Sequence, residues 1–307
     1  MKIKILGSTL TVALIMFAIW YFFISLKDNP LSQQFIVGSY DYPAVNTSTF
    51  ELSELEPNSY KLSFHSYDGS LVNGQISFPL ECNVRCPVLV GISAMGRNYN
   101  RWWVDSWKGR KTVTNVNELG RVALKNGYAV VAIDARYHGS RKDPDKTLAS
   151  IMNDLHFFGD KSPYEEMIVN TVKDYRVLID WLSANSRIDS ENIVMAGYSM
   201  GGQISLLAAS VDNRISSVVS IVPPSLDDKV AMVAPKNVVP LISASKLLLV
   251  TSDDDENASK AENKFLFDLI PTNDKKHYVF EGDHILPVSY VDSIEKWLIQ
   301  SGKSKKF

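Results

Sequence analysis

Ile193-Val-Met-Ala-Gly-Tyr-Ser-Met-Gly-Gly202 is the stretch where this chain changes from a strand pattern to a helix pattern. Its first four residues form a short apolar run, and residues 203–210 continue as a small, apolar, helix-prone segment. Gly197 and Gly201 flank Ser199 in the pattern G-x-S-x-G. Such glycines let a strand and a helix pass close together, while the turn projects the serine hydroxyl beyond the sheet. We therefore predict that Ser199 is a catalytic nucleophile rather than an incidental serine in a glycine-rich turn.

Short apolar runs recur on both sides of this stretch and predict a mostly parallel sheet. The predicted strands are 88–92, 129–133, 193–196, 218–222, 247–250 and 277–280. The helical patterns that separate them are 117–125, 170–182 and 289–299. Continuous apolar strands alternating with helices are typical of an open α/β sheet covered on both faces. An alternating pattern around Asp68-Gly69 predicts a β-hairpin before this sheet.

A serine hydroxyl needs a general base to act as a nucleophile, and histidine is the usual one. His65 and His277 lie inside strand patterns and are interpreted as structural, and His156 lies in a connecting segment. His284 lies in a turn after the last predicted strand, downstream of the serine. Because parallel sheets carry their sites at the carboxyl ends of strands, we predict that His284 is the base. The alternative is a polar turn residue.

The base needs an orienting carboxylate, and Ser252-Asp-Asp-Asp255 offers three at the end of a predicted strand. With these elements the chain resembles an α/β-hydrolase of the serine esterase or dienelactone-hydrolase type, from about residue 60 to residue 297. The order serine, acid, histidine is the order of that fold.

In relatives the strand before the acid usually ends in a pattern like G-x-x-D, with the last aspartate catalytic. With Ser252 at the glycine position, the resemblance implies Asp255 as the acid. Asp253 and Asp254 remain open alternatives, and a solvated acidic loop is the expected role of the two that are not catalytic.

The resemblance also implies an oxyanion hole. One donor is the backbone N–H of Met200, the residue after the nucleophile. The second comes from the loop after the first parallel strand, where the position-by-position match gives Met95. The family usually has His-Gly in this loop, and this chain has Ser93-Ala94 instead.

A further loop, Asp134-Ala-Arg-Tyr-His-Gly-Ser140, is similar to the D-x-R-G-H-G-x-S loop of many such hydrolases. There it mostly packs and shapes the floor of the site, so the resemblance implies a structural role for His138. The segment 223–245 lies where the fold often inserts a lid, and its length allows at most a small cap.

The N-terminus differs in kind from the rest of the chain. No charged residue occurs from Ile5 to Leu26, and a stretch of about 20 apolar residues is long enough to cross a bilayer as a helix. We predict an uncleaved signal-anchor, because no small-x-small cleavage site follows directly; the alternative is a cleaved signal peptide. Lys2 and Lys4 precede the segment, so the positive-inside tendency places the domain on the outer, extracytoplasmic face of the membrane.

Composition narrows the remaining choices. Lys plus Arg total 32 and Asp plus Glu total 34, and this near-neutral balance does not support a nucleic-acid partner. Cys82 and Cys86 are the chain's two cysteines; a disulfide between them suits an oxidising compartment, and two ordinary thiols are the alternative. Without nearby histidine or cysteine partners they make a poor zinc site.

We therefore predict a membrane anchor over residues 1–27, an irregular tether over 28–59 and an α/β-hydrolase domain over 60–307. The predicted activity is that of a membrane-anchored serine hydrolase acting on a small-molecule or lipid-like acyl ester, without a metal or organic cofactor. Alternatives with the same triad are a thioesterase or lipase-like enzyme and a peptidase. A non-catalytic binding protein of this fold is the alternative from another class.

Overall fold

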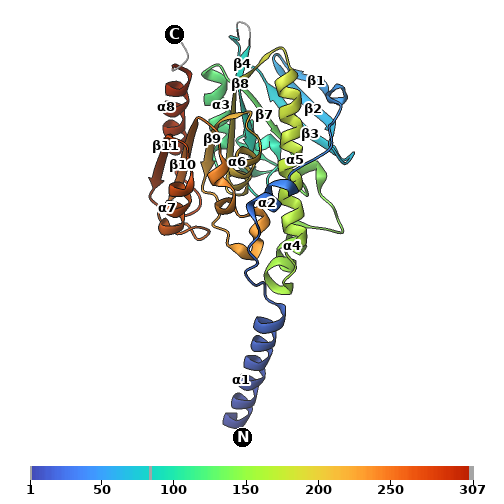
Figure 1. The fold of residues 1–307 in the computed structure, drawn as a ribbon, viewed down its shortest axis with the longest axis vertical. Helices are drawn as coiled ribbons and strands as arrows, with labels where there is room; N and C mark the ends of the chain where they lie inside the picture. The colour runs from blue at the N-terminus through green and yellow to red at the C-terminus, as the bar shows by residue number, and fades with distance from the viewer. Residues whose placement is uncertain (1, 83–84, 304–307) are drawn as a thin grey trace.

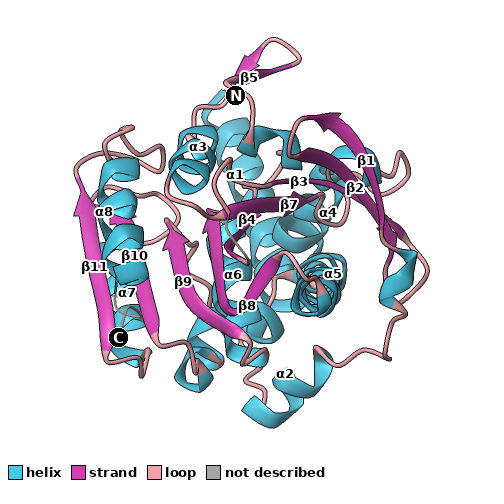
Figure 2. Ribbon diagram, turned by 90° about the horizontal axis from the view of Figure 1, so that it is seen from above, coloured by secondary structure: helices cyan, strands magenta, loops and turns pink. Residues whose placement is uncertain are grey.

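The computed structural model describes residues 2–82 and 85–303, and the side chains of residues 11–82 and 85–300. In this part of the chain a nine-stranded sheet has the order β1-β2-β3-β7-β4-β8-β9-β10-β11, and Figure 2 shows these strands across the domain from β11 at one side to β1 at the other. The strands are β1 (Glu51–Glu56), β2 (Ser59–His65), β3 (Leu71–Ser77), β4 (Cys86–Ile92), β7 (Ala129–Ile133), β8 (Ile188–Tyr198), β9 (Ile215–Ile221), β10 (Lys246–Ser252) and β11 (Asp274–Phe280). Neighbours from β7 to β11 are parallel, whereas β1, β2 and β3 are antiparallel to their neighbours. The predicted parallel sheet and hairpin are confirmed.

Helices cover both faces of this sheet. The α-helices are α1 (Lys2–Ile19), α2 (Gln33–Ser39), α3 (Val116–Lys125), α4 (Leu148–Asn153), α5 (Ser162–Ala184), α6 (Met200–Val211), α7 (Lys260–Leu269) and α8 (Tyr290–Lys303). The shorter turns are η1 (Trp20–Ile24), η2 (Thr47–Thr49), η3 (Tyr99–Trp102), η4 (Gly139–Arg141), η5 (Asp154–Phe158), η6 (Asp228–Val233), η7 (Pro235–Asn237) and η8 (Val239–Leu241). Buried side chains of α5 and α6 form one core layer, and those of α3 and α8 form the other. Along β4, Val88 and Val90 face the first layer while Leu89 faces the second, as strand periodicity requires.

The segment predicted as an irregular tether, 28–59, is instead packed on the domain. Ile36 of α2 and Tyr40, which directly follows α2, are fully buried, and the Tyr40 hydroxyl donates to the backbone oxygen of Met232 at 2.9 Å. Phe50 stacks on Phe64 and Trp181, with ring centroids 4.1 and 5.0 Å apart. The sequence did not predict this because the buried residues are few and widely spaced. In addition, every residue of β1 is exposed, so that strand lacks the alternating pattern of a half-buried strand.

The N-terminal segment is helical over most of the predicted span. α1 is followed directly by the π-helical turn η1, and Figure 1 shows α1 projecting away from the domain. The Trp20 indole N–H donates to the backbone oxygen of Phe157 at 2.7 Å, which fastens the base of this segment to η5. Across the described residues, no helix has both the length and the apolar character needed to span a membrane. The side chains of Lys2 and Lys4, on which the predicted orientation depends, lie outside the described residues.

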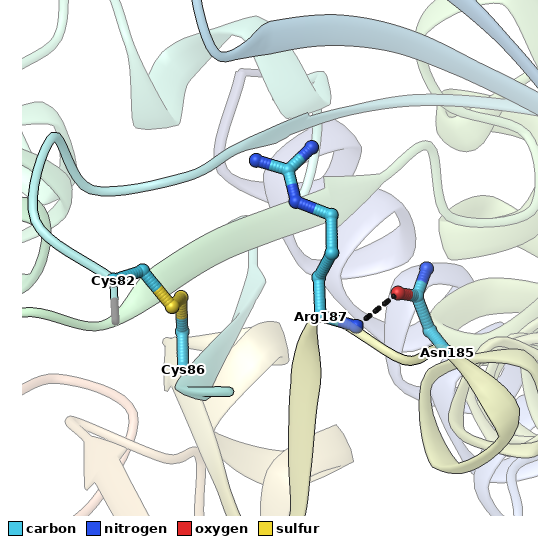
Figure 3. The surroundings of a disulfide bond; sticks show 4 residues. All are labelled: Cys82, Cys86, Asn185 and Arg187. Atoms are coloured by element: carbon cyan, nitrogen blue, oxygen red, sulfur yellow. Dashed lines mark hydrogen bonds between the residues drawn. A yellow bond between two sulfur atoms is a disulfide. The ribbon is translucent and has the colours of Figure 1, made fainter. Parts of the chain in front are cut away.

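The two cysteines form a disulfide at the start of β4, with their Cα atoms 5.7 Å apart (Figure 3). Of the two possibilities that the sequence left open, a disulfide and two ordinary thiols, the structure has the disulfide. Next to it the Cys86 N–H donates to the backbone oxygen of Arg187 at 2.9 Å, and the Arg187 N–H donates to Asn185 Oδ1 at 3.0 Å. The disulfide therefore closes a short loop at the amino end of the sheet, away from the carboxyl ends that carry the predicted site.

Candidate active site

The serine of the G-x-S-x-G motif lies between β8 and α6. Ser199 has φ 57° and ψ −118°, a conformation that side-chain-bearing residues rarely adopt. A Cβ added to Gly197 would lie 2.0 Å from the Gly201 backbone oxygen, and one added to Gly201 would lie 2.2 Å from the Ile92 oxygen. The two glycines are therefore required for the close crossing of strand, helix and neighbouring loop, as predicted from the motif.

Three predicted site residues form a continuous chain of hydrogen bonds. Ser199 Oγ lies 2.8 Å from His284 Nε2, and His284 Nδ1 lies 3.0 and 2.9 Å from the two carboxylate oxygens of Asp255. Asp255 is 9% exposed and also accepts a hydrogen bond from the Asn257 N–H at 2.8 Å. A base that contacts the nucleophile on one side and a carboxylate on the other is the arrangement that activates a serine hydroxyl.

The other two aspartates of the acidic loop do not contact His284. Asp253 Oδ1 accepts from the Gly282 N–H at 3.0 Å, and this hydrogen bond lowers the pKa of the Asp253 carboxyl. The Asp254 side chain is exposed, while its N–H donates to the Gly282 oxygen at 3.0 Å. Asp253 is thus more than a solvated residue, because it fixes the turn that precedes His284.

Tyr198 is a site residue that the sequence analysis missed. Its side chain is fully buried, and its hydroxyl donates to the His284 backbone oxygen at 2.8 Å while accepting from the Leu286 N–H at 2.9 Å. Tyr198 therefore holds the histidine loop directly beside the nucleophile that follows it in sequence. A tyrosine at the first x of G-x-S-x-G carries no signal for this contact, because its partners lie 86 and 88 residues away.

The two predicted oxyanion donors come from adjacent elements. β4 pairs with β8 in parallel, and Ile92 is opposite Gly197, so the loop that contains Met95 emerges beside the nucleophile. Met200 is the first residue of α6, where a backbone N–H has no acceptor within the helix. Both residues lie at the same edge of the sheet as Ser199. Their role as an oxyanion hole stays a prediction.

The loop that contains His138 follows β7 at the same edge of the sheet. His138 is fully buried, and its Nδ1 lies 2.7 Å from the Arg136 backbone oxygen. Burial lowers the pKa of His138 to about 4, so the ring is neutral near pH 7. Arg136 and Arg141 both pair with the buried Asp174, at 2.7 and 2.6 Å. These contacts agree with the structural role that was predicted for His138.

The segment expected to carry at most a small cap, 223–245, contains the short turns η6, η7 and η8. It leaves the sheet after β9. The insertion 142–161, with α4 and η5, leaves after β7 and was not predicted. Both insertions rise from the carboxyl ends of parallel strands, as does the loop that contains Asp255.

Comparison with known families supports the architecture. Residues 103–241 match the model of the alpha/beta hydrolase fold. The chain has the α/β-hydrolase fold. The matched segment includes Ser199 but neither Asp255 nor His284, so the positions of those two side chains come from the structure. No curated protein sequence matches this chain.

Solved structures extend the α/β-hydrolase fold over most of the chain. Acetyl xylan esterase 1 from Thermoanaerobacterium sp. JW/SL YS485 has a TM-score of 0.70 at 17% identity, covering 90% of this chain and 96% of that one. An acetyl xylan esterase from Paenibacillus sp. R4 has a TM-score of 0.63 at 15% identity, with coverages of 91% and 97%. A cold-adapted esterase from an Arctic intertidal metagenomic library has a TM-score of 0.60 at 17% identity, with coverages of 84% and 99%. At these identities the likeness establishes the fold.

Proposed function

We propose that this chain is a serine hydrolase that cleaves carboxylic esters through an acyl-enzyme. The observation that carries the proposal is the hydrogen-bonded chain from Ser199 through His284 to Asp255, located at a strained strand–helix turn. The names of similar folds, two acetyl xylan esterases and a cold-adapted esterase, support ester bonds as the target.

The proposed reaction has two halves. His284 Nε2 takes the proton of Ser199 Oγ as that oxygen attacks the ester carbonyl, and the Asp255 carboxylate holds the ring and stabilises its positive charge. The N–H groups of Met200 and Met95 stabilise the tetrahedral oxyanion, and His284 returns the proton to the departing alcohol. A water then attacks the acyl-enzyme with the same histidine as base, which releases the acid and restores the serine.

A thioesterase, a lipase-like enzyme or a peptidase could use the same residues, and a binding protein could keep the fold alone. The binding alternative is disfavoured because a protein without chemistry has no need for the nucleophile, base and acid together. Segment 223–245 forms only short turns, which leaves little material for the large lid of a typical lipase.

A matched pair of substrates distinguishes esterase activity from the cleavage of amides. We expect the protein to hydrolyse 4-nitrophenyl acetate with saturable kinetics and to leave 4-nitroacetanilide, which carries the same acyl group on an amide, unhydrolysed. Extending the ester series from acetyl to dodecanoyl measures acyl-chain preference, and acetyl-CoA serves as the thioester arm. Faster cleavage of the anilide than of the ester would contradict the esterase assignment.

We further propose that the N-terminal segment attaches the domain to a membrane, with the domain on the extracytoplasmic side. The absence of charge from Ile5 to Leu26 supports insertion. Many large apolar side chains of the described part of this segment are exposed: Val12, Leu14, Ile15, Met16, Phe17, Ile19, Tyr21, Phe22, Phe23 and Ile24. Exposed apolar surface of this extent suits lipid better than water. The Cys82–Cys86 disulfide supports an oxidising compartment.

Membrane attachment is tested by fractionation of cells that express the full chain. We expect the protein to sediment with membranes, to resist extraction by alkaline carbonate and to retain residues near Met1 in N-terminal sequencing. Protease added to sealed right-side-out membranes should digest the domain. A soluble mature form that begins near Lys27 would identify the segment as a cleaved signal peptide, and a protease-protected domain would reverse the orientation.

A further inference from the structure

A cavity of about 650 Å³ lies beside the loop that contains Met95. Its walls come from β2 and β3, from the loops after β4 and β7, and from the small hairpin formed by β5 (Ser106–Trp107) and β6 (Arg110–Lys111). Gly96 and Arg97, which line the cavity, directly follow Met95 in sequence. The cavity therefore begins where the predicted oxyanion loop ends.

The lining of this cavity is strongly cationic. Its basic residues are Lys61, Arg97, Arg101, Lys108, Arg110 and Lys142, and its one carboxylate is Asp134. Asp134 is buried and already accepts hydrogen bonds from the Tyr99 N–H at 3.1 Å and from the Ser140 N–H and hydroxyl at 2.8 and 2.9 Å. Among the described residues, no ion pair to a carboxylate is formed by any of the six cations. Six cationic side chains against one carboxylate leave the lining with a net positive charge, which favours an anionic occupant.

One of the six cations, Arg101, is buried in the domain and is not a mobile surface side chain. It is 4% exposed, and its guanidinium donates only to neutral acceptors: the Arg110 oxygen at 2.6 Å, Thr112 Oγ1 at 3.1 Å and the Trp107 oxygen at 3.4 Å. Its Nε has no hydrogen-bond partner, and neither does the nearby acceptor Asn98 Oδ1. Burial of an arginine without a carboxylate is costly unless another anion compensates it.

The strand order relates one wall residue of the cavity, Asp134, to the nucleophile. Asp134 follows β7 and Ser199 follows β8, with β4 between them in the sheet. Two strand spacings correspond to about 10 Å. A separation of this size between Asp134 and Ser199 is within the length of one small molecule.

We propose that this cavity binds an anionic group, of the sulfate or phosphate type, on an ester substrate whose acyl carbon reaches Ser199. The substrate assignment rests on the proposed esterase function, whereas the anion site itself does not. Lys108 and Arg110 are exposed residues of the β5–β6 hairpin, so their side chains can be changed without disturbing the core. The hydrogen bond that Arg101 donates to Arg110 is accepted by the Arg110 backbone oxygen, so it survives the substitution of the Arg110 side chain.

Binding is measured first, by titration calorimetry of inorganic phosphate into full-length Ser199→Ala protein at low ionic strength. An exposed charge typically changes affinity about two- to fivefold, so Lys108→Gln with Arg110→Gln should raise the Kd about tenfold. Lys111→Gln is the matched control, because Lys111 lies on the same hairpin, is exposed and does not line the cavity. We expect less than a twofold change for it. No phosphate binding, or equal weakening by Lys111→Gln and by the double variant, would overturn the anion site.

Catalysis is the second arm, with 6-acetoxynaphthalene-2-sulfonate compared with neutral 2-naphthyl acetate. The double variant should lower kcat/KM for the sulfonate about tenfold and leave that for the neutral ester unchanged, while Lys111→Gln should change neither. An equal effect on both esters would overturn the substrate assignment. If the wild-type protein cleaves neither ester, the esterase proposal and the substrate assignment fail, and phosphate binding still decides the anion site.

Discussion

Ser199→Ala is expected to lower kcat for ester hydrolysis by about 10⁶-fold, the scale on which serine triads depend on their nucleophile. The reason is that no acyl-enzyme can form without Ser199 Oγ, because His284 has no hydroxyl left to activate. Residual catalysis from the remaining site is expected to stay well below the wild-type rate. The measurement is steady-state hydrolysis of 4-nitrophenyl acetate by protein whose far-ultraviolet circular dichroism matches the wild type.

Ser205→Ala is a suitable control for this substitution. Ser205 lies in α6, the helix that follows Ser199; it is fully buried and donates its hydroxyl to the Gly202 oxygen at 2.8 Å. We expect its kcat to remain within about threefold of the wild-type value, because one local hydrogen bond contributes only about 1 kcal/mol to stability. Comparable activity in Ser199→Ala and Ser205→Ala would mean that the catalytic nucleophile is another residue.

Asp255→Asn is expected to lower kcat by about 10⁴-fold, as seen when the orienting aspartate of a serine triad is replaced by its amide. The asparagine has nearly the same shape, but its uncharged side chain no longer stabilises the imidazolium and allows the wrong tautomer of His284. Because Asp255 contacts both the ring and the Asn257 N–H, thermal unfolding should accompany the kinetic assay.

The neighbouring aspartates provide matched controls. Asp253→Asn retains an oxygen that can accept from the Gly282 N–H, and Asp254 has an exposed side chain. We expect each of these substitutions to lower kcat less than tenfold. A severe loss in Asp254→Asn with normal activity in Asp255→Asn would show that the acid is one residue earlier.

Local patterns account for what could be predicted of the fold and the site. Each apolar strand, like the G-x-S-x-G turn, is encoded within about ten consecutive residues. Periodicity and glycine placement are therefore sufficient to predict them. The assignment of Asp255 among three adjacent aspartates came from a family pattern. The structure shows its physical basis, since the Asp255 carboxylate contacts His284 whereas Asp253 binds the Gly282 N–H.

Features that depend on distant contacts could not be predicted in this way. Tyr198 holds the loop of His284 through partners more than eighty residues away. The segment 28–59 packs on the domain through single residues such as Tyr40 and Phe50. The helix α7 did have a local signal that was overlooked, the capping box of Ser259 and Glu262. The cationic cavity also depends on distant contacts, because its residues come from separate elements that only the sheet order brings together.

The central claim is that Ser199 is a nucleophile activated by His284, and labelling with a fluorophosphonate probe tests it most directly. Such probes react covalently with an activated serine, and digestion followed by mass spectrometry identifies the modified residue. We predict one adduct, on the peptide that contains Ser199, formed in wild-type protein and absent from Ser199→Ala. An unmodified Ser199 in folded wild-type protein, or equal labelling of the wild type and the variant, would contradict the claim.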